Sequence, residues 1–254
     1  MSTAAAEIRK LAHQLGVASA DLDFLEKLAA DDLRELRARI GDYLFEADRH
    51  HFSKVATVSR LVPNAVAAKV TEFALPPLIA ARTAELLEPA KAADMVGRLS
   101  DRYLADVSAA MDPTRCPQVI AQIPPTSVAK VGAELARRKE WVVMGGFVSV
   151  VSGPALRASV AELHGEQLLH VGYVLDDLSR MDEITQLLTD SQLDKMLCAA
   201  VAHQLWDELD GVLSHLTGAQ AQRIAGRCAA APEPIRVAIV ASPLGASART
   251  ALAL

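Results

Sequence analysis

Residues 77–101 read PLIAARTAELLEPAKAADMVGRLSD, and the segments on either side repeat their pattern. Residues 52–76 read FSKVATVSRLVPNAVAAKVTEFALP, and residues 102–125 read RYLADVSAAMDPTRCPQVIAQIPP. In each segment an apolar residue stands two positions before a proline, and small and aliphatic residues follow at helical spacing. A period between about 20 and 50 residues is typical of proteins built from stacked repeats.

The apolar residue that marks each unit recurs along most of the chain. Successive markers are 26, 24, 24, 28, 24 and 26 residues apart, a variation that changes in loop length would produce. The pattern is clear in the first three units, and after Pro125 it weakens but keeps its spacing. The markers are Leu61, Leu87, Met111, Leu135, Leu163, Leu187 and Leu213.

Each unit predicts two short helices. Pro63, Pro89 and Pro113 follow the first three markers. Proline is tolerated in the first turn of a helix, where its missing N–H costs nothing. Each of these prolines should therefore end one helix and open the next. We expect helices of about 9–13 residues joined by one to three residues, and no strand alternation competes with them.

Helix starts and apolar faces support the same interpretation. Residues 189–192 (TDSQ) and 217–220 (TGAQ) fit the capping box, in which the first and fourth residues bond each other's backbone. Val66, Val70 and Phe73 have the spacing of one helix face, which stacking should bury. Short helices bury such faces only against neighbouring units. The predicted fold is an all-α solenoid, a superhelix of short antiparallel helix hairpins with a repeat of ~25 residues.

The repeats divide the chain into three expected parts. Residues 1–51 form an N-terminal helical cap, residues 52–228 the superhelix, and residues 229–254 a C-terminal tail. The tail should be partly ordered and fold back as a second cap, and residues 235–240 (IRVAIV) are its only apolar run. An end repeat needs a modified outer face, which favours a cap at the N-terminus. A dimerisation helix is the alternative there.

Three helices are expected within the N-terminal part. They cover residues 7–15, 21–30 and 32–47, and the last opens with a capping box from Asp32 to Glu35. One apolar stripe on the last helix consists of Leu33, Leu36, Ile40 and Leu44.

Composition excludes several classes of protein. Of 254 residues, 51% are hydrophobic and 22% charged, which is incompatible with intrinsic disorder. Aromatics make up 4%, fewer than a β-sandwich prefers. The net charge of −5 lacks the basic excess of a nucleic-acid binder. Residues 51–139 carry +4 and residues 162–210 carry −9, a contrast that suits steering of a partner or a head-to-tail homo-oligomer. A solvated acidic face is the simpler interpretation.

Cysteine usage and hydropathy predict a cytoplasmic location. Cys116, Cys198 and Cys228 are far apart and form no CxxC pair, which indicates buried thiols in a reducing compartment. The first residues, MSTAAAE, do not resemble a signal peptide. The longest apolar stretch, residues 141–151, is interrupted and shorter than the ~20 residues that span a bilayer, so the chain is not expected to be transmembrane.

The repeat punctuation resembles that of a known family. Residues 86–99 (LLEPAKAADMVGRL), and Met111-Asp112-Pro113 followed by VIAQIPP, are similar to the cytosolic N-terminal superhelical domain of MgtE-type magnesium transporters. That domain stacks short helix pairs with a leucine, acidic residue, proline punctuation. The family's CBS-type repeats and transmembrane helices have no counterpart in this sequence. Without the transmembrane helices we expect no transport, and the resemblance implies a stand-alone, bacterial-type soluble protein with at most a regulatory or interaction role.

The search for catalytic chemistry yields only weak candidates. Glu46 and His50 are four residues apart and could share a metal on one helix face, yet no partner cluster accompanies them. The resemblance adds Asp176 and Asp177 as candidates for a divalent cation held through water. A solvated helix end and a solvated acidic face are the simpler interpretations. We therefore expect no cofactor.

Three other features have competing interpretations. His203 and Asp207 are four residues apart, which favours a hydrogen-bonded pair over a catalytic one. Cys116 precedes Pro117 at a predicted helix start, where the pKa of a thiol would fall. Gly145 and Gly146 predict a buried hairpin in which the absence of side chains lets two helices approach closely. The alternative is a surface for an apolar ligand or membrane, formed by Trp141, Met144 and Phe147.

These observations favour a non-enzymatic binding or scaffold module. Its curved helical-repeat surface would hold a protein partner, because solenoids present extended concave surfaces. The alternative is the binding or sequestration of an apolar small molecule or lipid in a groove between helices. A third hypothesis, an enzyme or metal protein, depends on the weak carboxylate and histidine candidates above.

Overall fold

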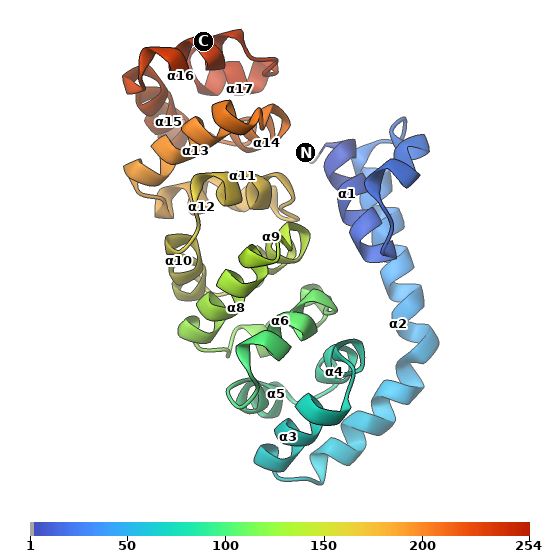
Figure 1. Ribbon diagram of the computed structural model, residues 1–254. Coiled ribbons are helices and arrows are strands. Elements are labelled where there is room, and N and C mark those ends of the chain that lie inside the picture. Colours follow the sequence, from blue (N-terminus) through green and yellow to red (C-terminus); the bar gives the residue numbers. More distant parts are fainter. Residues whose placement is uncertain (1–2) are drawn as a thin grey trace. The chain divides into compact units, whose positions relative to one another are not determined.

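The computed structural model describes residues 3–254 and is all-α in that range, with 76% of the chain helical and no strand (Figure 1). Many short helices follow one another and pack in sequence. Two compact units divide the chain. The central unit is Arg34–Ser159, and the terminal unit joins Met1–Leu33 to Val160–Leu254.

The helices of the central unit pack against the helix two places further along the chain. Thus α3 packs on α5 and α5 on α7, while α4 packs on α6 and α6 on α8. Tyr103 and Val107 of α6 form a core with Ala80 and Ala81 of α4. The elements are α2 (Ala30–Arg60), α3 (Asn64–Ala74), α4 (Pro77–Ala84), α5 (Pro89–Val96), α6 (Asp101–Ala109), η2 (Pro113–Arg115), α7 (Pro117–Ile120), α8 (Pro125–Arg137), α9 (Trp141–Val148) and α10 (Gly153–Ala161).

The terminal unit combines helices from both ends of the chain. In it α11 packs on α13 and α14, α13 packs on α15 and α16, and α17 packs on α14 and α15. The elements are α1 (Ala4–Leu15), η1 (Ser19–Leu25), α11 (Gly165–Tyr173), η3 (Leu178–Arg180), α12 (Met181–Leu187), α13 (Asp190–His203), α14 (Trp206–Leu213), α15 (Gly218–Ala230), α16 (Glu233–Ala241) and α17 (Ala246–Ala251).

Close approach between α11 and its neighbours requires glycine. A Cβ atom at Gly165 would lie 2.3 Å from the carbonyl oxygen of Lys195 in α13. One at Gly172 would lie 2.6 Å from Cγ2 of Val212 in α14. Because both distances are far below a normal contact, the helices meet here at the separation that only glycine allows.

Prolines lie at the starts of several helices. Pro89 is the first residue of α5, Pro63 is the N-cap of α3, and Pro113 opens the short 3-10 helix η2. At the N1 position proline loses no hydrogen bond, so each of these prolines marks a helix start without strain. Further prolines open α4, α7 and α8.

Four local predictions about helix bounds and helix caps are wrong. Residues 30–60 form one continuous helix, α2, since no proline or glycine interrupts residues 42–60. Asp32 therefore lies inside α2 and opens no capping box, and Ser19–Leu25 is a 3-10 helix. The backbone N–H of Thr217 donates to Asp182 (3.0 Å), and this carboxylate also bonds the Thr217 hydroxyl in place of the expected capping box. The capping box from Thr189 to Gln192 is confirmed.

The expected C-terminal tail forms two helices, α16 and α17. Over the part of the chain that the structure describes, no helix combines the length and the hydropathy that crossing a membrane would require.

Candidate functional site

An exposed apolar stripe lies on α3. Its residues Val66, Val70 and Phe73 are 51%, 54% and 94% exposed. The expectation that stacking buries this face is wrong. Instead, α3 turns the small residues Ala67 and Ala68 inward and packs on α5 through that side, which leaves the larger residues in solvent.

Two apolar side chains at and just after the end of α2 are also exposed. Leu61 is 84% exposed and Val58 is also exposed, so the first marker differs from the others. Leu87, Leu135, Leu163 and Leu213 are buried, and Met111 and Leu187 are half-buried. We call Val66, Val70 and Phe73, which share one face of α3, the α3 surface. Exposed apolar groups that gather on a protein are typical of interaction sites.

Exposed charged side chains also lie on α2 and α3. Lys54 of α2 and Lys69 of α3 are exposed. The carboxylate of Glu72, also on α3, accepts hydrogen bonds from the backbone N–H and the hydroxyl of Ser100. Glu72 keeps its negative charge, because Ser100 is neutral, so the exposed charges of α3 are the Lys69 ammonium group and the Glu72 carboxylate.

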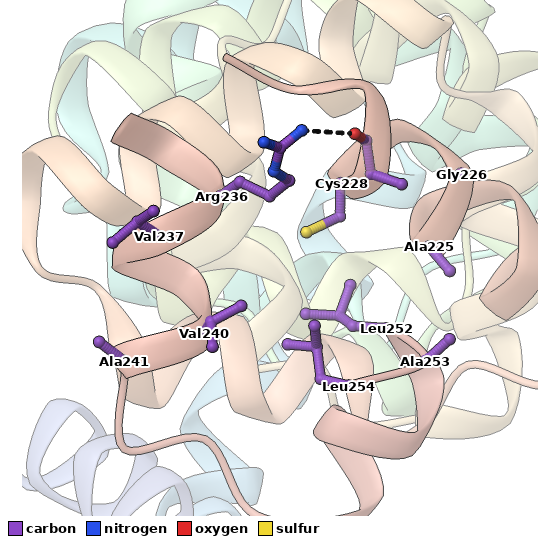
Figure 2. Close-up of a pocket in the computed structure, with 11 residues that line it drawn as sticks. Ala225, Gly226, Cys228, Arg236, Val237, Val240, Ala241, Leu252, Ala253 and Leu254 are labelled. Atoms are coloured by element: carbon purple, nitrogen blue, oxygen red, sulfur yellow. Dashed lines mark hydrogen bonds between the residues drawn. The ribbon is translucent and has the colours of Figure 1, made fainter. Parts of the chain in front are cut away.

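A pocket of about 630 Å³ lies in the terminal unit between α15, α16 and the segment that follows α17 (Figure 2). Val237 and Val240 of α16 line it from one side, and Leu252 and Leu254 from another. Its floor carries the side chain of Cys228 from α15, a buried free thiol. Pockets of this size and apolar character accommodate small organic ligands.

Arg236 places the one positive charge among the residues that line this pocket. One of its guanidinium nitrogens donates to the carbonyl oxygen of Ala229 at 3.3 Å (Figure 2). Burial raises the pKa of the Cys228 thiol, and the charge of Arg236 partly opposes that rise. The thiol is therefore protonated and packs as a small apolar group.

A buried ionic cluster joins the two chain segments of the terminal unit. The ammonium of Lys10, on α1, is 1% exposed and donates to Glu7 (2.8 Å), to the carbonyl oxygen of Leu175 (3.0 Å) and to Asp176 (3.0 Å). A buried charge is tolerated only when it is paired and hydrogen-bonded, as here. The cluster therefore attaches α1 to the segment after α11, a structural role.

A second charged group extends this attachment. Glu208 of α14 lies 3.3 Å from Arg9 Nη1 and 3.4 Å from His170 Nδ1. The hydrogen bond from His170, together with Arg9, lowers the pKa of Glu208 to about 2. The guanidinium of Arg9 also lies 4.8 Å from the centre of the Tyr173 ring, a cation–π contact.

The candidate metal ligands lie in different environments. Glu46 accepts a hydrogen bond from Arg49 at 3.0 Å, and the ring of His50 lies against that of His51. Asp176 binds Lys10, and Asp177 accepts a hydrogen bond from the backbone N–H of Ser179. Within residues 3–254, no three His, Cys, Asp or Glu side chains come together as metal ligands.

Three further predictions have structural outcomes. His203 ends α13 and faces Glu166 at 3.8 Å, so the predicted pair with Asp207 is wrong, because Asp207 belongs to α14. The prediction for Cys116 is also wrong, because burial and nearby acidic groups raise the pKa of its thiol to about 12. The prediction of three buried thiols fails at Cys198, which is exposed.

The candidate ligand segment is α9. Its Met144 is buried, as are Gly145 and Gly146, while Trp141 and Phe147 are half-buried. The pocket of Figure 2 is instead lined by α15, α16 and the residues after α17, a location that the sequence analysis did not assign. The signal was the run of residues 235–240, in which Val237 and Val240 follow the charged Arg236 on a short helix.

Comparison with protein-family models, with curated proteins and with solved structures finds no match for this chain.

Proposed function

We propose that the protein is a non-enzymatic binding module that docks a protein partner on the α3 surface. The exposure of Phe73, at 94%, is the observation that carries the proposal. A phenyl ring fully in water loses the ~1.5–3 kcal/mol that burial would contribute. Phe73 shares its helix face with Val66 and Val70, so one partner could bury all three together.

The packing order of the central unit supports this docking site. We infer a solenoid-like arrangement from the packing of α3 on α5 and α4 on α6, in which each layer covers the one before it. An end layer normally carries a polar outer face. The outer face of α3 is apolar instead, which favours continuation of the stack by another molecule.

The chemistry of the surface specifies the kind of partner. A helix with apolar residues at positions i, i+3, i+4 and i+7 fits an apolar helix face. Carboxylates beside that apolar face would meet Lys69, which lies on α3 between Val66 and Phe73 at helical spacing from both. The proposed partner is therefore a protein that presents an acidic amphipathic helix.

The resemblance to the superhelical domain of MgtE-type transporters supports the same class of role, because that domain is also a stack of short helix pairs. The three free cysteines, Cys116, Cys198 and Cys228, suit the reducing conditions of a cytoplasmic protein. Both points concern architecture and compartment, and the docking proposal depends on the α3 surface alone.

Substitution of Phe73 tests the proposal. Tagged wild-type protein, Phe73→Asp and the matched control Phe24→Asp are compared by quantitative affinity mass spectrometry in lysate of the source cells. Phe24 is 74% exposed in η1, so the control introduces the same charge at another largely exposed phenyl. We expect wild type and Phe24→Asp to capture at least one protein in similar amounts. Phe73→Asp should capture at least tenfold less of that protein.

A photocrosslinking amino acid at Val70 locates the contact. The captured protein should crosslink through this position, and the crosslinked peptide should lie on an acidic amphipathic helix. Light scattering over a concentration series shows whether the partner is a second copy of the chain. The proposal would be contradicted if Phe73→Asp captured the same proteins as wild type and Phe24→Asp, if no protein crosslinked through position 70, and if light scattering gave the same mass for all three proteins.

A further inference from the structure

We propose that the pocket between α15 and α16 binds a single acyl chain that carries a carboxylate, of the size of a long-chain fatty acid. This site belongs to the terminal unit and is independent of the α3 surface. The argument depends on the size of the pocket, its apolar lining and its single cation.

The lining leaves apolar side chains in contact with water. Val237 and Val240 are 58% and 48% exposed, and Leu254 is also exposed. Figure 2 shows these three side chains and Leu252 around the same space. A ligand that fills the space would remove their apolar surface from water, which is the main source of affinity for a lipid chain.

The volume suits a chain of this kind. Small-molecule sites have volumes of roughly 300–1,000 Å³ and are lined mainly by apolar groups. The pocket has about 630 Å³ and one side that is open to solvent, where Val237 and Val240 are exposed. An acyl chain can therefore enter from the side of α16 and fold against the residues of α15.

Arg236 determines the charge of the ligand. Two other arginines, both on α15, form ion pairs with α13: Arg223 binds Asp190, and Arg227 binds Asp194. Arg249 donates to the backbone carbonyl oxygens of Leu244 and Ser242.

Arg236 makes its hydrogen bond to one carbonyl oxygen, that of Ala229, and it is exposed at the edge of the pocket. A guanidinium group has five N–H donors, so several remain for a ligand. Guanidinium pairs bidentately with a carboxylate, whereas a neutral head group would gain no such contact. The geometry therefore favours an anionic head at Arg236 and the acyl chain between α16 and the residues after α17.

Binding of palmitate tests the site directly. Isothermal titration calorimetry below the micellar concentration compares palmitate with hexadecanol, which has the same chain length and a neutral head. We expect palmitate to bind wild type with 1:1 stoichiometry and at least tenfold more tightly than hexadecanol. Arg236→Gln should remove this preference, while the control Lys195→Gln, an exposed cation on α13, should keep it.

The thiol of Cys228 gives a second, local readout. In a Cys198→Ser background, palmitate should slow the modification of Cys228 by a thiol reagent, followed by mass spectrometry. Val240→Glu, which places a carboxylate in the lining of the pocket, should abolish both binding and protection, and circular dichroism verifies that the variant is folded. The proposal would be overturned if palmitate bound only weakly and if its affinity were the same for wild type, Arg236→Gln and Val240→Glu. So would a failure of palmitate to protect Cys228.

Discussion

The contact between α11 and α13 supports a sharp prediction about a single methyl group. In Gly165→Ala the new Cβ would lie 2.3 Å from the carbonyl oxygen of Lys195, 2.4 Å from its carbonyl carbon and 2.6 Å from the backbone nitrogen of Met196. Ordinary contacts of a Cβ lie at 3.4–4 Å, so the overlap exceeds 1 Å. All three atoms belong to the backbone of α13, and no change of rotamer can relieve the clash.

The expected cost follows from this geometry. Overpacking of a core typically destabilises a protein by about 1–3 kcal/mol. Alanine is a better helix former than glycine by about 1 kcal/mol in a helix interior, and less of that gain applies at the first residue of α11. We therefore expect Gly165→Ala to lower the free energy of unfolding by about 1–3 kcal/mol. The melting temperature should fall by roughly 2–4 °C per kcal/mol for a chain of this size.

Urea unfolding followed by circular dichroism measures this change. Gly226→Ala is the matched control, because Gly226 lies inside α15 and a Cβ there meets no atom within 4 Å. The control should raise stability by up to about 1 kcal/mol, through helix propensity alone. If Gly165→Ala were as stable as wild type, the close approach of α11 to α13 would be incorrect.

Three other perturbations test the charged and thiol groups. Lys10→Met should lower the free energy of unfolding by about 3–5 kcal/mol because it removes the buried ammonium that Glu7 binds, and Lys10→Met combined with Glu7→Leu should recover much of this loss in urea unfolding. The pKa of Glu208 is lowered to about 2, so its contribution to stability is complete above pH ~4.5 and is lost as pH falls towards 2; Glu208→Gln should flatten that part of the acid-unfolding curve. Iodoacetamide should modify exposed Cys198 well before Cys116, whose buried thiol has a pKa raised to about 12. Peptide mass spectrometry measures both modifications over time, and equal rates would contradict the burial of Cys116.

Helix content was predictable because the strongest signals are local. Prolines at positions such as Pro89 and the capping box at Thr189 act within one turn, and both lie at helix starts in the structure. The continuity of α2 was missed because weak capping residues such as Asp32 were given more weight than an uninterrupted run of helix-compatible residues. A helix persists through such residues when nothing breaks it.

The sites were less predictable because they depend on which neighbour a helix meets. Periodicity identified Val66 and Phe73 as one face of α3, yet it could not show that the smaller Ala67 side packs inward. The ion pair between Lys10 and Asp176 joins residues 166 positions apart, and no local pattern encodes that contact. The α15–α16 pocket likewise requires residues after α17 to return to α15.

The order in which this chain is synthesised gives α1 an unusual history. Translation proceeds at about 5–20 residues per second, so α1 leaves the ribosome roughly ten to thirty seconds before Asp176 and Leu175 exist to receive the Lys10 ammonium. During that interval α1 already has its neighbour η1, which follows it directly in the chain, but the Lys10 ammonium lacks these two acceptors. Arg34–Ser159 is meanwhile complete and free to fold. The Lys10 ammonium of the nascent chain therefore stays hydrated until the segment after α11 has been translated.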